Sequence, residues 1–252
     1  MHTISQCFIP KNLLVMRFRN KIGMTQKFAF TLAEVLITLG IIGVVSAMTL
    51  PDLIDDYREK QTVTQLKKVY SQLSQVYMLF MEENGSVFTS NFDAASRDEL
   101  FNMLKKHYNK IIECNSNSRP CYTKDYYKML LGSDYSYGYG IFAGKAIKSF
   151  ITADGVTFGI GYDGAYQLEK IYVDLNGVKG PNRYGYDAFV FIINKNKIVP
   201  YKNAQYCNLT NDKNQPVPNG VGCTWWVISH ENLDYQKCIK GKSKYCKINY
   251  AE

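Results

Sequence analysis

A single carboxylate, Glu34, lies near the start of a long apolar segment. The segment begins at Phe30 and runs almost without interruption to Pro51, which is about the length that crosses a bilayer. An ionised side chain in such a segment is costly, so it is expected to have a functional partner. Cleavage between Ala29 and Phe30 would place a new α-amine one helical turn from Glu34. The amine of one copy could then neutralise the acid of the next copy.

A second group of polar side chains lies in a glycine-rich loop that follows an expected strand. It provides two carboxylates and two amides, from Asp174, Asn176, Asn182 and Asp187. Oxygen ligands of this kind suit a hard cation such as calcium. The same residue types also close turns by hydrogen bonding to their own backbone. The sequence therefore leaves two interpretations open, a calcium site and a plain turn.

Six of the seven cysteines follow the apolar segment, which is typical of a disulfide framework in an oxidising compartment. They are Cys114, Cys121, Cys207, Cys223, Cys238 and Cys246. The sequence does not select among the pairings, although Cys114 and Cys121 bracket a short polar loop and make the best single pair. A zinc site is disfavoured, because there is no C-x-x-C motif and the histidines His107 and His230 are far apart.

The sequence offers no residue constellation typical of an enzyme. It has no G-x-S-x-G, Walker or H-E-x-x-H motif, so we expect a protein without catalytic activity. Nucleic acid is not an expected partner either. Of 30 basic and 22 acidic side chains, five basic ones and no acid lie in residues 1–29, so the rest carries a net charge of only +3, with no dense run of Lys and Arg.

Aromatic residues are unusually frequent, with 20 tyrosines in the chain. Aromatic loops can stack on sugars or bases, but a place in the core or in a subunit interface is favoured. The densest stretch contains Tyr122, Tyr126, Tyr127, Tyr135, Tyr137 and Tyr139. Trp225 and Trp226 adjoin Cys223 and are interpreted as packing beside a disulfide.

Two helices are expected to position these groups. Apolar side chains recur three or four residues apart from Leu66 to Phe80, which predicts that the helix of the apolar segment continues as far as Glu83. A second helix is expected over 97–108, with Ser96 and Glu99 as a capping box.

The rest of the chain predicts antiparallel strands. Asp154 and Gly155 form a strong hairpin signal between two alternating segments. Strands are expected at 147–152, 156–160, 171–174, 188–194 and 197–199. Helices followed by a meander of strands predict an α+β fold with an antiparallel sheet.

The start of the apolar segment resembles the N-terminal signature of type IV pilins and type II secretion pseudopilins. This signature is a short basic leader and a small residue, followed by Phe-Thr-Leu-x-Glu and an apolar helix. The residues that match it are Phe30, Thr31, Leu32 and Glu34. Pro51 matches a helix-bending proline seen in many members. Ala29 departs from the pattern, because the family usually has Gly before the cut, although Ala is also small.

The resemblance implies cleavage between Ala29 and Phe30, N-methylation of Phe30 and an assembly role for Glu34. It implies a pilin-like fold in which a long helix packs on an antiparallel sheet. The implied parts are a leader (1–29, with Met24 as a better start), a transmembrane assembly helix (30–51), its amphipathic continuation (52–84) and a globular domain (85–252). The loop from Asp174 to Asp187 also loosely resembles a pseudopilin loop that binds calcium, although that loop is more acidic.

The function implied by the resemblance is that of a pilin-like structural subunit. It would sit in the inner membrane with a single span and a periplasmic C-terminal domain, and assemble into a type II secretion pseudopilus or a type IV pilus. Its implied partners are copies of itself, other pilin-like subunits, the prepilin peptidase and the inner-membrane assembly platform. Two alternatives stay open: a minor tip pilin that binds DNA or a surface ligand, and an unprocessed membrane-anchored receptor.

Overall fold

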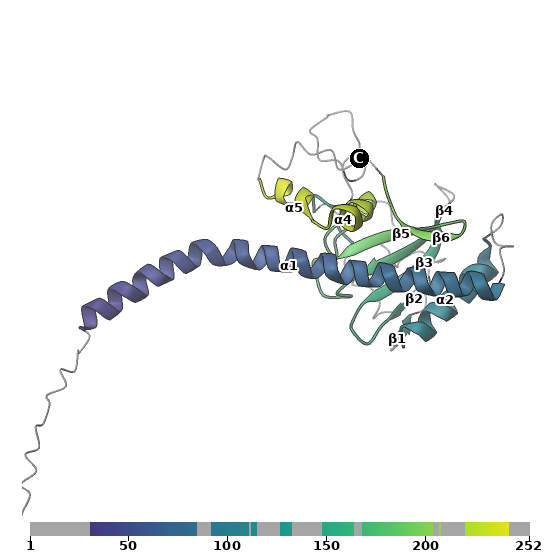
Figure 1. Cartoon of the computed structure of the whole chain (residues 1–252), viewed down its shortest axis with the longest axis horizontal. Coiled ribbons are helices and arrows are strands. Elements are labelled where there is room, and N and C mark those ends of the chain that lie inside the picture. The colour runs from purple at the N-terminus through teal and green to yellow at the C-terminus, as the bar shows by residue number, and fades with distance from the viewer. Residues whose placement is uncertain are drawn as a thin grey trace, which may run out of the picture. The chain divides into compact units, whose positions relative to one another are not determined.

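The chain is α+β, with a long N-terminal helix and a six-stranded antiparallel sheet (Figure 1). The computed structural model describes residues 31–84, 92–110, 112–114, 127–132, 148–163, 168–203, 207 and 220–241. Its elements in chain order are α1 (Leu32–Asn84), α2 (Ala94–His107), β1 (Ile112–Cys114), β2 (Lys148–Ile151), β3 (Thr157–Asp163), β4 (Leu168–Asp174), β5 (Ala188–Asn194), β6 (Lys197–Pro200), the 3-10 helix η2 (Val221–Cys223), α4 (Thr224–His230) and α5 (Asp234–Ile239).

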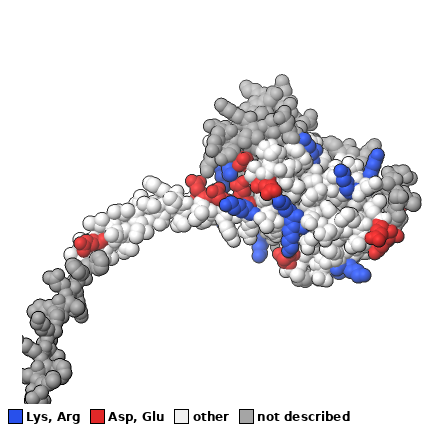
Figure 2. Space-filling model, in the orientation of Figure 1, with Lys and Arg blue, Asp and Glu red and all other residues white. Residues whose placement is uncertain are grey.

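The chain divides into two compact units, Met1–Thr49 and Leu50–Glu252, and α1 has residues in both. In the first unit, every residue from Thr31 onward is exposed except Ser46, which is half-buried. Figure 2 shows the surface of this part of α1 as uncharged apart from one acidic spot. By length and composition, this apolar part of α1 could form a single membrane span.

In the second unit, α1 buries one face against the sheet. Its buried side chains are spaced three or four residues apart, as predicted, and are Val63, Leu66, Val69, Leu73, Val76, Tyr77 and Phe80. This spacing places them in one stripe of the helix. They join the main core with apolar side chains of the sheet, such as Phe150 and Phe158. The ring of Tyr70 stacks on Phe191 with centroids 5.5 Å apart.

The sheet is a meander in which each strand pairs with the next one along the chain, in the order β1-β2-β3-β4-β5-β6. The predicted turn between β2 and β3 is confirmed. Gly155 has a φ of +84° there, which suits glycine because it lacks a Cβ. The Thr152 hydroxyl closes the turn by donating to Asp154 Oδ1 at 2.6 Å and accepting the Val156 N–H at 3.1 Å.

The predicted start of the second helix was wrong. α2 begins at Ala94, and its N-cap is Asp93, whose carboxylate accepts the Ser96 N–H at 2.9 Å. Asp is among the strongest N-cap residues, so Asp93 provides the cap that was assigned to Ser96 and Glu99. The short elements β1, α4 and α5 were not predicted, because three to seven residues carry little periodic signal.

Candidate functional site

The first candidate site is the start of α1. Ala29 and Phe30 lie outside the described residues, so cleavage and methylation there stay predictions. Glu34 lies in the first turn of α1 and is exposed. Apolar side chains around it are exposed as well, with Leu36 at 60% and Ile37 at 61%. A continuous exposed apolar surface along a helix is typical of contact with lipid or with another protein.

The second candidate site is the loop between β4 and β5, where the structure brings together the four residues predicted to bind calcium. Asp174 is the last residue of β4 and pairs with Ala188, the first residue of β5. Asp187 directly precedes Ala188, so the two carboxylates flank the base of the loop. Asn176 and Asn182 lie within the loop itself.

Asp174 is fully buried. Its Oδ2 accepts a hydrogen bond from the Tyr127 hydroxyl at 2.5 Å. Its Oδ1 accepts a hydrogen bond from the Asn176 N–H at 3.1 Å. Burial and the nearby charge of Asp187 raise the pKa of Asp174 well above its ordinary value, against the opposing effect of these hydrogen bonds. Full ionisation of both carboxylates is therefore costly unless a positive charge lies beside them.

Asp187 is 5% exposed. Its two oxygens accept the backbone N–H groups of Arg183 at 2.7 Å and Asn182 at 2.8 Å. Burial raises the pKa of Asp187, and the hydrogen bonds from these backbone groups and from the Asn176 side chain oppose the shift. The loop thus wraps its own backbone around one carboxylate.

Two amide oxygens of the loop have no hydrogen-bond donor. They are Oδ1 of Asn176 and Oδ1 of Asn182, and both atoms are buried. A buried polar atom without a partner costs about 1–3 kcal/mol and suggests that an ion or a water completes the site. The plain-turn interpretation does not account for these two atoms.

The donor set fits a hard cation. Two carboxylates and two amide oxygens are the ligand types that calcium takes, and further carbonyl oxygens or waters would complete its shell of six to eight. Among the described residues, no group of three or more His, Cys, Asp or Glu side chains is placed to hold a metal ion. A cation in this loop would therefore need the amide oxygens as well as the two acids.

Sequence reasoning missed two residues that support this loop. Tyr127 was interpreted only as a core or interface residue; it is 2% exposed and also holds Asp174. Arg183 was not singled out, and its Nε donates to the Met129 carbonyl at 3.0 Å. Lys128 and Arg183 form a β-bridge, so the segment 127–132 is bound to the loop. Sequence offers no signal for a contact between segments this far apart.

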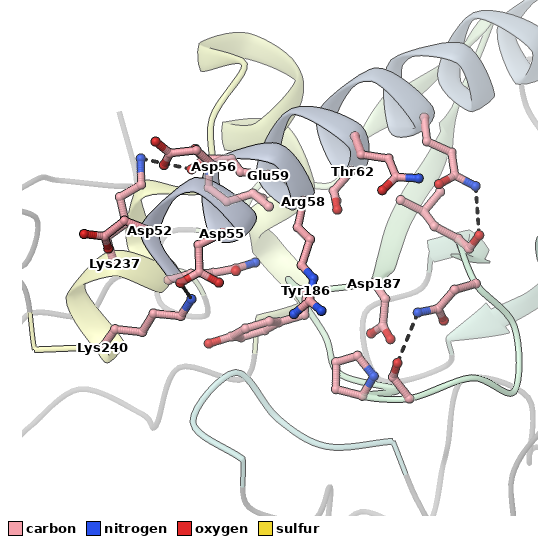
Figure 3. A pocket seen from close by; sticks show the side chains of 18 residues that line it. Asp52, Asp55, Asp56, Arg58, Glu59, Thr62, Tyr186, Asp187, Lys237 and Lys240 are labelled. Carbon is pink, nitrogen blue, oxygen red and sulfur yellow. Dashed lines mark hydrogen bonds and ion pairs between the residues drawn. The ribbon is translucent and has the colours of Figure 1, made fainter. Parts of the chain in front are cut away.

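A pocket of about 780 Å³ lies beside the loop (Figure 3). Its walls come from α1, the loop and α5. The lining residues are Asp52, Asp55, Asp56, Arg58, Glu59, Gln61, Thr62, Gln65, Leu175, Asn176, Gly180, Pro181, Tyr186, Asp187, Leu233, Gln236, Lys237 and Lys240. Five of these side chains are acidic and three are basic. Asn176 and Asp187 belong both to the lining of the pocket and to the loop, so the pocket adjoins the candidate calcium site.

Hydrogen bonds and ion pairs hold the walls of the pocket together. Lys237 pairs with Glu59 at 2.9 Å and Lys240 with Asp55 at 2.6 Å, which ties α5 to α1. The Gln65 side chain donates to the Leu175 carbonyl at 2.8 Å, which ties α1 to the loop. Sequence reasoning did not predict this pocket, because α5 was not expected.

The described cysteines are oxidised. Cys207 and Cys223 form a disulfide with an S–S distance of 2.08 Å. Cys114 and Cys238 are disulfide-bonded as well. Cys121 and Cys246 lie outside the described residues, so the pairing of Cys114 with Cys121 stays a prediction.

The aromatic residues are only partly described. Tyr127 belongs to the core, whereas the other tyrosines singled out between 122 and 139 lie outside the described residues. Trp226 is buried, donates from Nε1 to Asn232 at 2.7 Å and stacks on His230. These contacts account for Trp226 as a packing residue.

Comparison with models of protein families, with curated proteins and with solved structures gave no match.

Proposed function

We propose that this chain is a pilin-like structural subunit. In this proposal a prepilin peptidase cleaves it before Phe30, and an inner-membrane platform assembles it with copies of itself and with other pilin-like subunits. The product is a filament, either a type II secretion pseudopilus or a type IV pilus. The role is structural rather than catalytic.

The observation that carries the proposal is a contrast along one helix. Residues 32–51 of α1 expose apolar side chains on all sides, whereas the part from Val63 to Phe80 buries a single stripe against the sheet. A helix that is apolar all round belongs in lipid or in a protein core. The first part is suited to a membrane before assembly and to the core of a filament after it. The second part packs on the sheet and so holds the globular unit to the helix.

Two further features support a periplasmic C-terminal unit. Five basic residues and no acid precede the apolar segment, which favours a cytoplasmic N-terminus. The disulfide between Cys207 and Cys223 is of the kind that persists in oxidising compartments.

The test is the assembly of a Glu34→Ala variant. Intact-mass measurement of the native protein should give Phe30 as the first residue, with one added methyl group. Glu34→Ala should still insert and be cleaved, but sheared filaments should contain far less of it than of wild type. Glu82→Ala, which removes an exposed acid near the other end of α1, should assemble normally. Normal filament yield from Glu34→Ala would refute the proposal.

We further propose that the loop from Asp174 to Asp187 binds calcium. Support comes from the two buried carboxylates and from the two buried amide oxygens that lack a donor. In the bound protein the ion would supply positive charge where two acids lie close together. The chain's own contribution is the prearranged set of oxygens, which Tyr127 and the backbone of Arg183 hold in place.

A further inference from the structure

Thr157 carries another buried oxygen that has no hydrogen-bond partner within the described part of the chain. In this respect its hydroxyl oxygen joins Oδ1 of Asn176 and Oδ1 of Asn182. Thr157 is the first residue of β3 and is fully buried. A buried hydroxyl without a partner is costly, so an ion or a water is expected beside it.

The fold brings this hydroxyl to the candidate calcium loop. Thr157 pairs with Asp174, the last residue of β4. Directly paired residues present their side chains on the same face of a sheet, with Cβ atoms about 4.5–5.5 Å apart. The hydroxyl also lies against the loop itself. A Cβ placed on Gly177 would lie only 3.2 Å from Thr157 Oγ1 and 2.7 Å from the Gly155 carbonyl oxygen, so glycine permits this close approach.

We propose that the Thr157 hydroxyl is a further ligand of the calcium ion, supplied by β3 to the loop between β4 and β5. This inference rests on the proposed binding of calcium by that loop. A cation accounts for the partnerless oxygens of Thr157, Asn176 and Asn182 together, since it takes hydroxyl and amide oxygens alike as ligands. It also brings positive charge beside two buried carboxylates, which a water does not.

The dependence of the melting temperature on calcium concentration, measured on the full chain in detergent micelles, gives the calcium affinity. Thr157→Val keeps the branched shape but removes the oxygen, so it should weaken calcium binding by about tenfold. Thr157→Ser keeps the oxygen and should bind calcium with nearly the wild-type affinity. Thr224→Val is the matched control, because Thr224 is also buried but its hydroxyl oxygen accepts the Val190 N–H at 2.9 Å. It should leave the affinity unchanged.

Melting without calcium separates an ion ligand from an ordinary structural hydroxyl. Thr157→Val should then melt at or above the wild-type temperature, because it removes a buried polar atom that has no partner. Thr224→Val should melt below wild type with or without calcium, because it leaves the Val190 N–H without its acceptor. If a buried water were the partner of the Thr157 hydroxyl, Thr157→Val would instead melt lower by the same amount in both conditions.

Terbium, a luminescent probe of oxygen-rich calcium sites, tests whether the hydroxyl touches the ion. Comparison of its luminescence lifetimes in H2O and in D2O gives the number of waters bound to the ion. Thr157→Ala leaves room for a water, so it should raise this number above that of wild type. Thr224→Ala should leave the number unchanged.

The inference would be overturned by any of the following results. Equal calcium affinity in Thr157→Val and wild type would show that the hydroxyl does not serve the ion, although the calcium site itself would stand. An unchanged number of waters on terbium in Thr157→Ala would show that the hydroxyl does not touch the ion. If calcium did not affect wild type at all, the proposed binding by the loop would fail, and the role of Thr157 would fail with it.

Discussion

The hydroxyl of Tyr127 donates a hydrogen bond to Oδ2 of Asp174, and both side chains are buried. The two residues are 47 positions apart in the chain. Burial and the charge of Asp174 raise the pKa of Tyr127 well above its ordinary value, so the tyrosine stays a donor at neutral pH. This bond joins the segment 127–132 to the base of the candidate calcium loop.

Replacing Tyr127 with Phe should lower the free energy of unfolding by about 1–3 kcal/mol, because Asp174 then loses a donor in a buried position. Chemical denaturation of the full chain in detergent micelles measures this change. Tyr162→Phe is the control, since Tyr162 is 47% exposed, and it should have almost no effect. Equal stabilities for the two variants would show that the buried hydroxyl does not support Asp174.

Calcium should raise the melting temperature of the wild-type protein at concentrations on the order of millimolar, the range of weak extracellular sites. Asp187→Ala should abolish this shift, because it removes a carboxylate of the proposed site. Glu82→Ala makes the same change of charge at an exposed position and should keep the shift. The absence of a shift in wild type would favour the plain-turn interpretation.

Without calcium, the two loop acids should make stability fall as pH rises. Their pKa values in the folded state lie above the ordinary value of 3.8, so between that value and the raised ones the folded state binds more protons than the unfolded state. Stability then decreases with rising pH, by up to about 1.4 kcal/mol per pH unit for each proton. Asp174→Asn should flatten this dependence in calcium-free unfolding measurements from pH 4 upward. A slope unchanged by the substitution would contradict the raised pKa of Asp174.

Outside the loop, half-buried Arg97 forms an ion pair with buried Glu169. Arg97 donates to both carboxylate oxygens, at 2.8 and 2.6 Å, and Glu169 is only 7% exposed. Arg97→Ala leaves that acid buried and unpaired, so it should destabilise the protein by about 3–5 kcal/mol. Lys148→Ala breaks the exposed pair with Asp98 and should cost about 1 kcal/mol or less. Similar losses for both variants in chemical denaturation would contradict this assignment.

The cysteines after the apolar segment should all be oxidised. Thiol labelling of the native protein under denaturing, non-reducing conditions should therefore find no free thiol among them. Cys207, Cys223, Cys114 and Cys238 are already disulfide-bonded in the described part of the chain. Labelling of two or more cysteines would refute a complete framework.

The long helix and the strands from β2 to β6 were predictable because their signals are local. The stripe from Leu66 to Phe80 repeats with the period of a helix, and the turn at Asp154 and Gly155 uses residues that favour a tight hairpin. The start of α2 was misplaced because two cap residues, Asp93 and Ser96, compete within one short stretch. A local pattern identifies a helix more reliably than it identifies the helix's first residue.

The candidate calcium loop was predictable only in part. Its own oxygen-bearing residues are close together in sequence, so composition alone indicated them. The supporting contacts are not local: Tyr127 reaches Asp174, and Gln65 reaches the Leu175 carbonyl. These partners depend on how α1 and the segment 127–132 pack in the folded unit, which no local spacing encodes. The pocket was missed because one of its walls comes from α5, which was not expected.

The short outer strands of the meander limit how one copy can approach another. Among the described strands, the outermost are β1, with three residues, and β6, with four. β6 ends at Pro200, which has no N–H to offer. Short edges of this kind resist the strand-to-strand pairing that leads to aggregation. Within the described strands, a second copy would therefore find few edge residues to pair with, whereas the exposed apolar part of α1 offers a far longer surface.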